Sequence, residues 1–311
     1  MAEKWVSGTR PTLNFFLEYN KIMNEQEICY LCGHNEFEKL DGIVRDNPDL
    51  DILKCKNCSL VFLSSFEHIC ENFYENDGMF GGTFGGSQKL KKWLKETKDD
   101  DSRRFNMLKK EIKGKKVLDF GCGNGGFLTR AKKIVQRAVG IELQKSVGDF
   151  HNQNGLEVHQ NVDKVEEKFD YITLFHVLEH LKDPIELLQT IGKKLTSEGQ
   201  MIIEVPNAND ALISLYKNPW FMRFTYWSCH LYLFDEQTLL EVAKKAGFKV
   251  NYLKKVQRYG LANHIWWQFA KKPGGHKKLW FLNCKILNKL YEKSLATLNA
   301  TDTLIISVSK K

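Results

Sequence analysis

A glycine-rich turn lies near the middle of the chain, in the stretch VLDFGCGNGGF at residues 117–127. Gly121, Gly123 and Gly126 satisfy the G-x-G-x-x-G spacing, in which glycines let a backbone turn approach a nucleotide at the start of a helix. Asp119 precedes the turn. A carboxylate at that position would repel a pyrophosphate and attract a cation, so the turn is poorly suited to a dinucleotide.

Glu142 ends the second predicted strand of this region, in AVGIEL at residues 138–143. A carboxylate there suits a ribose diol, because two hydroxyl donors can share it. S-adenosylmethionine combines a ribose with an ammonium and a sulfonium group, and it carries no phosphate. The two acids around the glycine turn therefore favour S-adenosylmethionine over NAD as the cofactor.

Two C-x2-C pairs stand near the N-terminus: CYLC with Cys29 and Cys32, and CKNC with Cys55 and Cys58. This spacing is typical of a tetrahedral zinc site, since two thiolates from each pair can converge on one ion. Disulfides are disfavoured, because the N-terminal sequence reads as neither a signal peptide nor a membrane span. We expect a structural zinc ion in a ribbon at residues 27–63, a unit too small to fold without its metal.

Two histidines are candidate catalytic bases. His176 stands in FHVLEH directly after the predicted strand FDYITLF, and His230 stands in WSCHLYLF after the aromatic-rich segment LYKNPWFMRFTYW. A neutral imidazole at the edge of the sheet could take a proton from an attacking hydroxyl, because its pKa lies near neutrality. His180, in the same motif as His176, is expected to pack beneath its helix.

The elements that must position these residues alternate between helix and strand from about residue 101 onward. The predicted strands are KVLDF, AVGIEL, FDYITLF and GQMIIEVP, followed by KVNYLKKV and DTLIISVSK. The helix DPIELLQTIGKKL has Asp183 as its N-cap and Pro184 as its first residue. This alternation predicts an α/β fold with a doubly wound parallel sheet, whose reacting groups lie beyond the carboxyl ends of the strands.

We divide the chain into three parts. Residues 1–75 hold the zinc ribbon, and residues 76–100 hold a glycine-rich linker or lid, ENDGMFGGTFGGSQ, followed by a lysine-rich helix. Residues 101–311 form the main domain, with helical and aromatic cap insertions at 208–229 and 258–298. The second insertion contains RYGLANHIWWQFAKKPGGH, whose aromatic side chains could stack on a sugar ring or could simply form a helical core.

The chain resembles the class I S-adenosylmethionine-dependent methyltransferases from about Phe105 to Val250 and again at its last strand. The motifs that carry the resemblance are VLDFGCGNGGF, AVGIEL, FDYITLFHVLEHLKDP, GQMIIEVPN and HLYLFDEQTLLEVAKKAGF. It implies a seven-stranded Rossmann-like sheet whose last strand lies antiparallel between its neighbours. It also implies the cofactor contacts: Asp119, Gly121, Cys122, Gly123 and Asn124 at the methionine and ribose, Glu142 at the ribose hydroxyls, Leu143 at the adenine, Asn161 or Val162 at the adenine edge, and His176 beside the cofactor.

The segment around His230 is similar to one in sugar C-methyltransferases, which reads Tyr-His-Glu-His and accompanies an N-terminal four-cysteine zinc module. Here Trp227 stands at the tyrosine position and Cys229 at the glutamate position. Removal of a proton from carbon needs a stronger base and stabilisation of an enol, so the loss of two polar groups favours O-methylation. The resemblance thus implies methylation of a sugar or nucleotide-linked sugar in surface-polysaccharide or deoxysugar biosynthesis, with His230 as the base and His176 as the reserve candidate. Sugar C- or N-methylation stays an alternative.

The net charge of +8 would permit a nucleic-acid partner, but the lysines are scattered in pairs along predicted helix faces, as on a solvated surface. An RNA methyltransferase that grips RNA through the zinc ribbon is disfavoured, because LFHVLEH lacks the Asn/Asp-Pro-Pro-aromatic element of many base-amine methyltransferases. A non-enzymatic, metal-dependent scaffold is the remaining hypothesis. We expect a cytoplasmic protein without membrane insertion that acts on a small molecule; the oligomeric state and the methylated position stay open.

Overall fold

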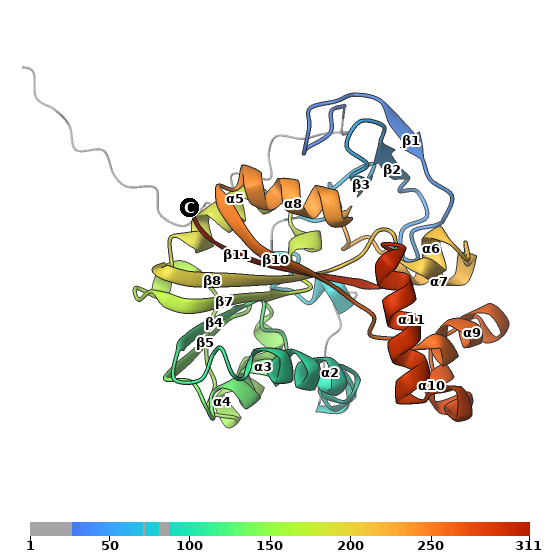
Figure 1. Ribbon diagram of the computed structural model, residues 1–311. Coiled ribbons are helices and arrows are strands. Elements are labelled where there is room, and N and C mark those ends of the chain that lie inside the picture. The colour runs from blue at the N-terminus through green and yellow to red at the C-terminus, as the bar shows by residue number, and fades with distance from the viewer. Residues whose placement is uncertain (1–26, 71, 81–86) are drawn as a thin grey trace, which may run out of the picture.

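The structure is a computed structural model that describes residues 27–70, 72–80 and 87–311. Its centre is a seven-stranded sheet in the order β10-β11-β8-β7-β4-β5-β6 (Figure 1). The strands are β4 (Lys116–Phe120), β5 (Arg137–Ile141), β6 (Glu157–His159), β7 (Phe169–Phe175), β8 (Leu195–Pro206), β10 (Phe248–Val256) and β11 (Thr303–Lys310). The strands from β8 to β6 pair in parallel, whereas β11 runs antiparallel to both β8 and β10. The predicted sheet, including its antiparallel last strand, is confirmed.

Helices cover both faces of this sheet. In Figure 1, α5 and α8 lie on one face, and α2, α3 and α4 lie on the other. Their bounds are α2 (Ser87–Leu108), α3 (Gly126–Ala131), α4 (Gly148–Gln153), α5 (Pro184–Gly192) and α8 (Glu236–Lys245). The central strands are therefore buried on both sides, and they read as continuous apolar runs such as YITLF and MIIEV.

Local capping defines where two of these helices begin. The side chain of Asp183 accepts a hydrogen bond from the backbone N–H of Glu186 (2.9 Å), and Pro184 is the first residue of α5. Asp235 and Thr238 form a reciprocal capping box at the start of α8. These bonds satisfy backbone donors that have no partner within the first helical turn. The predicted start of α5 is confirmed.

One long helix, α2, replaces the two helices expected on either side of residue 100. The acidic run Asp99–Asp101 does not interrupt it, because Asp100 pairs with Arg103 (3.1 Å) and Asp101 with Arg104 (3.7 Å) one turn later. The expected boundary at 100/101 thus falls inside a continuous helix. Most of the glycines of the expected lid fall in residues 81–86, which lie outside the described residues.

The N-terminal module is a four-stranded sheet in the order β1-β2-β3-β9. Its strands are β1 (Phe37–Lys39), β2 (Ile52–Cys55), β3 (Val61–Leu63) and β9 (Tyr232–Leu233). β9 comes from the main domain, and it pairs antiparallel with β3. The module also shares one continuous apolar core with the central sheet. The ribbon expected as a separate unit is therefore built into the main domain.

Two groups of helices form the insertions. The first contains α6 (Ala211–Ser214) and α7 (Pro219–Thr225), and the second contains α9 (Leu261–Ala270), α10 (Gly275–Lys278), the 3-10 turn η6 (Trp280–Leu282) and α11 (Lys285–Thr297). Both groups lie at the same end of the sheet (Figure 1). Further 3-10 turns are η2 (Gly78–Phe80), η3 (Lys145–Val147), η4 (Val162–Lys164) and η5 (Leu178–His180). No helix in the described part of the chain is long and apolar enough to cross a bilayer.

Candidate active site

A cavity of about 900 Å³ opens beyond the carboxyl ends of the parallel strands. Residues that follow β4, β5, β7 and β8 line it, among them Gly121, Glu142, His176 and Asn207. This arrangement follows from the topology, because the carboxyl ends of parallel strands meet at one edge of the sheet. Side chains of α2 and α7, and the segment just before α9, supply further walls.

The glycine turn after β4 needs glycine at its first position. Gly121 has a φ of +71°, and a Cβ on it would lie 2.5 Å from Val177 Cγ2. Gly123 has a φ of +54°, and a Cβ there would lie 3.1 Å from the ring of Trp93. Both positions combine a left-handed backbone with close packing, so larger residues are disfavoured on two grounds. The turn thus brings backbone to the cavity wall, as its sequence predicts.

The two acids of the sequence pattern lie on either side of this turn. The carboxylate of Glu142 accepts hydrogen bonds from the backbone N–H groups of Gly123 (2.7 Å) and Gln144 (2.9 Å), which fix its orientation. Asp119 accepts a hydrogen bond from the hydroxyl of Thr173 (2.6 Å). Burial raises the pKa of Asp119 to about 7 and also raises that of Glu142. A cationic ligand beside Asp119 would favour its ionised form.

Every residue predicted to contact the cofactor lines this one cavity: Asp119, Gly121, Cys122, Gly123, Asn124, Glu142, Leu143, Asn161, Val162 and His176. Two of the polar side chains already have structural partners. Asn124 donates to the hydroxyl of Thr97 (3.0 Å) and accepts from the N–H of Gly126 (3.0 Å). The side-chain amide oxygen of Asn161 accepts a hydrogen bond from the backbone N–H of Asp163 (2.9 Å). Their amides therefore shape the cavity as well as line it.

His176 is held between two carboxylates. Its Nδ1 lies 3.0 Å from Glu179 Oε1, and its Nε2 lies 3.3 Å from Glu204 Oε1. Its backbone has a φ of +57°, a left-handed conformation that is unusual for a histidine. Although burial lowers the pKa of His176, the hydrogen bonds to Glu179 and Glu204 outweigh it and raise the pKa. Both ring nitrogens are occupied, so this imidazole is poorly placed to accept a proton.

Sequence reasoning missed a network of charged side chains around His176. Glu204, fully buried in β8, binds Arg103 and Arg104 of α2, each with a shortest N···O distance of 2.8 Å. Arg258, which lies just before α9, pairs with Asp100 of α2 (3.3 Å) and with Asp302, the residue just before β11 (3.3 Å). The one sequence signal was a glutamate inside the apolar run MIIEVP, because a buried acid needs cationic partners.

His230 lies in a second cluster with Glu179 and His180. Its Nδ1 contacts the carbonyl oxygen of Thr225 (3.0 Å), and the Nδ1 of His180 contacts that of Cys229 (2.7 Å). These contacts leave Nε2 as the open nitrogen of each ring. Glu179 Oε2 is buried and has no hydrogen-bond partner among the residues that the structure describes. One ligand atom from each of the three side chains lies within 4.8 Å of the other two, so the cluster also has the donor types of a metal site.

The pKa values in this cluster depart from the usual ranges. Burial and the nearby His180 lower the pKa of His230 to about 3, and burial also lowers that of His180. Glu179 is buried as well, but its contacts with His176 lower its pKa to about 2. The cluster is therefore an ionised glutamate beside two neutral imidazoles, at the wall of the cavity. His180, which was expected to pack beneath its helix, is buried but also lines the cavity.

Aromatic side chains line the cavity, and Tyr259 is the one that the second insertion supplies. Trp267 and His264 are buried in α9, where Trp267 packs against Phe221 and Phe224 of α7. The cavity wall contains Phe221, Phe224, Trp227 and Tyr259 instead. Trp267 thus contributes to a helical core, which was one of the two alternatives left open by the sequence.

The four N-terminal cysteines converge at the module's loops. Cys29 Sγ lies 3.5 Å from Cys58 Sγ, and Cys32 Sγ lies 3.5 Å from Cys55 Sγ. All four sulfur atoms lie within 4.8 Å of one another. Sulfur atoms around a tetrahedral zinc ion are about 3.8 Å apart, given Zn–S bonds of about 2.3 Å. The donor set and its geometry therefore fit a four-thiolate zinc ion, and they leave no open ligand position for a substrate.

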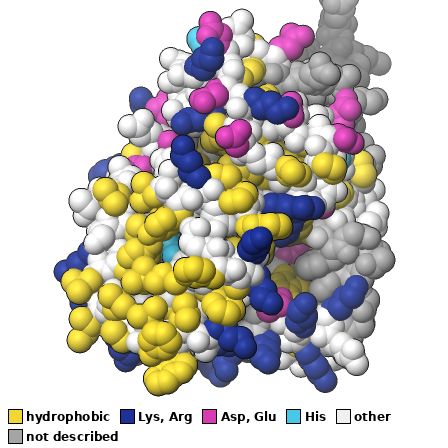
Figure 2. Space-filling view, turned by 90° about the vertical axis from the view of Figure 1, so that its right-hand side faces the viewer, with side chains coloured by type: hydrophobic (Ala, Val, Ile, Leu, Met, Phe, Trp, Pro, Cys, Tyr) yellow, Lys and Arg dark blue, Asp and Glu magenta, His cyan; other side chains and the backbone are white. Residues whose placement is uncertain are grey.

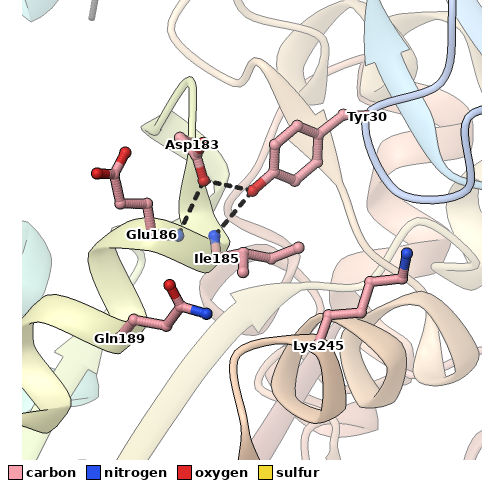
Figure 3. Close-up of a pocket in the computed structure, with 6 residues that line it drawn as sticks. All are labelled: Tyr30, Asp183, Ile185, Glu186, Gln189 and Lys245. Atoms are coloured by element: carbon pink, nitrogen blue, oxygen red, sulfur yellow. Dashed lines mark hydrogen bonds between the residues drawn. The ribbon is translucent and has the colours of Figure 1, made fainter.

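Tyr30, inside the first cysteine pair, joins this module to α5 (Figure 3). Its hydroxyl donates to Asp183 Oδ1 (2.5 Å) and accepts from the backbone N–H of Ile185 (2.9 Å). Tyr30, Asp183 and Ile185 line a shallow surface pocket. Glu186, Gln189 and Lys245 complete its wall. The loop that carries Cys29 and Cys32 thus completes the N-terminal cap of a helix in the main domain.

Residues 91–253 match the family described as a methyltransferase domain. The match spans more than half of the chain, and the chain belongs to this methyltransferase family. Its glycine turn, paired acids and seven-stranded sheet all lie within or beside the matched region.

Ubiquinone biosynthesis O-methyltransferase of Haemophilus ducreyi is 29% identical over 164 residues, covering 47% of this chain and 63% of that protein. A tRNA U34 carboxymethyltransferase of Campylobacter hominis is 32% identical over 114 residues, covering 32% of this chain and 40% of that protein. The chain thus spans less than two thirds of the length of these relatives. Among solved structures, magnesium protoporphyrin IX methyltransferase from Synechocystis PCC 6803 with bound SAH aligns with a TM-score of 0.48 and 11% identity, covering 77% of this chain and 97% of that one.

Proposed function

We propose that this protein transfers a methyl group from S-adenosylmethionine to a hydroxyl group of a sugar or nucleotide-linked sugar. The observation that carries the proposal is one cavity that combines the acid-flanked glycine turn with an open imidazole nitrogen and an aromatic wall. The cofactor needs the first feature and the acceptor needs the other two. The family match and the O-methyltransferase relatives support the reaction class.

We place the cofactor along the glycine turn. Asp119 would face its ammonium group, since a desolvated carboxylate gains most from a cationic partner. Glu142, already oriented by two backbone N–H groups, has lone pairs left for the ribose hydroxyls. Leu143 would pack on the adenine, with Asn161 or Val162 at its edge. The bound cofactor would supply an electrophilic methyl group. The protein then has to align the acceptor hydroxyl and accept the proton of that hydroxyl.

His230 is the proposed base. Its Nδ1 is held by the carbonyl of Thr225, so the lone pair is on Nε2, in the cavity wall. A weak base suffices here, because the hydroxyl becomes much more acidic as the methyl group bonds to its oxygen. The negative charge of the nearby Glu179 would stabilise the imidazolium that forms. His176, with both nitrogens engaged by carboxylates, is less suited to this role.

The sugar acceptor is inferred from chemistry rather than from the relatives. Flat apolar faces for a sugar ring are offered by Trp227, Tyr259, Phe221 and Phe224. The four-cysteine site, which we propose binds a structural zinc ion, stands apart from this chemistry because its thiolates complete the coordination.

The test is transfer of labelled methyl groups from S-adenosylmethionine into a panel of nucleotide-linked sugars. Transfer RNA serves as the comparison acceptor, because one relative is a tRNA carboxymethyltransferase. We expect label in a sugar and none in tRNA. Label in tRNA alone would overturn the acceptor assignment, whereas turnover of the cofactor with neither would point to a different small molecule.

A further inference from the structure

An apolar surface covers the outer side of the second insertion. Its side chains come from α9, η6, α11 and the residue after α11: Phe269 (79% exposed), Trp280 (74%), Phe281 (62%), Ile286 (76%), Leu290 (58%) and Leu298 (61%). We call this set the α9–α11 surface. Figure 2 looks onto this side of the molecule and shows an extended apolar area there, bordered by lysine and arginine side chains. A continuous group of exposed, large apolar side chains usually marks an interaction site.

The same segment is strongly basic. Residues 259–298 contain seven lysines and a single acid, Glu292. The lysines are all exposed: Lys271, Lys272, Lys277, Lys278, Lys285, Lys289 and Lys293. Within the described ranges of the chain, no carboxylate lies at ion-pair distance from any of them. Their charge is therefore left to an external partner of negative charge.

We propose that the α9–α11 surface docks the protein reversibly onto an anionic phospholipid bilayer. Exposed Trp, Phe, Ile and Leu side chains enter the headgroup region, and lysines beside them meet the negative headgroups, as in interfacial amphipathic helices. No helix needs to span the bilayer for this contact. The docking itself does not depend on the identity of the acceptor.

Two other partners fit the surface less well. A second copy of the chain, related by a two-fold axis, would bring the lysines of both copies face to face, which is repulsive. A nucleic acid would find the lysines favourable and could stack bases on Trp280 or Phe281, but it would leave the aliphatic side chains of Ile286, Leu290 and Leu298 exposed to water. Only a surface that is apolar inside and anionic at its rim matches both features.

The α9–α11 surface is linked to the cavity through α7. Trp267 of α9 packs against Phe221 and Phe224, which line the cavity wall, and Lys271 lies over the ring of Trp220 (4.7 Å). Trp220 and Phe224 are themselves about half exposed. Docking would therefore bring the cavity mouth near the bilayer. On the proposed function, this favours an acceptor that is attached to a lipid.

The test is co-sedimentation of the zinc-loaded protein with vesicles, in the absence of cofactor and acceptor. We expect binding to phosphatidylcholine vesicles that contain phosphatidylglycerol, weak binding to phosphatidylcholine alone, and loss of binding as salt is raised. The double variant Lys277→Gln/Lys278→Gln should bind about 25-fold more weakly, at about fivefold per lysine. Trp280→Ser/Phe281→Ser should weaken binding at least about tenfold at low salt.

Matched variants away from this surface provide the controls. Lys109→Gln/Lys110→Gln removes an exposed lysine pair after α2, and Ile43→Ser removes an exposed apolar side chain of the N-terminal module. Both should bind vesicles like the unmodified protein. Equal losses in test and control variants would overturn the proposal, as would no binding to the anionic vesicles. A dimer in light scattering that dissociates in Trp280→Ser/Phe281→Ser would also overturn it and assign the surface to a second copy.

Discussion

Asp119 should make cofactor binding depend on pH. Its carboxyl accepts a hydrogen bond from Thr173, and the charged groups around it are Arg104 and Asp101 of α2 and Glu142 after β5. Burial raises its pKa to about 7, so the unliganded protein holds Asp119 largely protonated below that pH. Only the carboxylate attracts the ammonium group of the cofactor. Affinity should therefore be complete above pH 7 and decline as the pH falls.

The size of the effect follows from proton competition. If the cofactor binds only the ionised form, its Kd rises by about 11-fold at pH 6 and about 100-fold at pH 5, relative to alkaline solution. The stability of the unliganded protein should move in the opposite direction. An unfolded aspartate has a pKa of about 3.9, so between about pH 4 and 7 the unfolded chain loses this proton first and Asp119 lowers stability as the pH rises.

Calorimetric titration with S-adenosylmethionine between pH 5 and pH 8 measures this dependence. Asp119→Asn should bind more weakly at pH 8, by about 10- to 100-fold, and should lose the pH dependence that comes from this group. Asp149→Asn, an exposed aspartate of α4, is the matched control and should behave like the unmodified protein. A Kd that is flat across this range, or that keeps its full pH dependence in Asp119→Asn, would refute the reasoning.

Three further predictions concern the zinc site, the base and the contact between module and domain. Metal analysis should find about one zinc per chain, and Cys55→Ser should lose the zinc and unfold the module; a folded, zinc-free protein would show the ribbon to be misassigned. His230→Ala should lower kcat about 10²- to 10⁴-fold and leave the Kd of the cofactor nearly unchanged. The control variant His159→Ala, in the edge strand β6, should keep its activity. Near-full turnover of His230→Ala would show that another group acts as the base. Tyr30→Phe should lower the free energy of unfolding by about 1–3 kcal/mol in denaturant titrations, because Asp183 loses one of its two hydrogen bonds and the N–H of Ile185 loses its acceptor. An unchanged value would show that water replaces the hydroxyl.

Much of the fold was predictable because its signals are local. Apolar runs and their spacing indicated the strands, and Asp183 with Pro184 marked the start of α5. The last strand's antiparallel place came from the family resemblance rather than from any local pattern. The expected boundary at 100/101 failed because α2 continues through it: Asp100 and Asp101 pair with Arg103 and Arg104 one turn later. Both arginines also bind Glu204 of β8, a long-range contact that local patterns do not indicate.

By itself the sequence determined the chemistry of the glycine turn. Asp119 near the end of β4, Gly121 just after β4 and Glu142 just after β5 all reach one cavity, because the carboxyl ends of parallel strands meet at one edge of the sheet. Only the tertiary structure decided what surrounds His176 and His230. Arg103, Glu204 and Arg258 are about 50 to 150 positions apart, and they meet because α2 contacts the end of β8 and the segment just before α9 reaches α2. Sequence spacing carries no record of such meetings, since strand order and helix docking depend on how distant apolar surfaces are buried together.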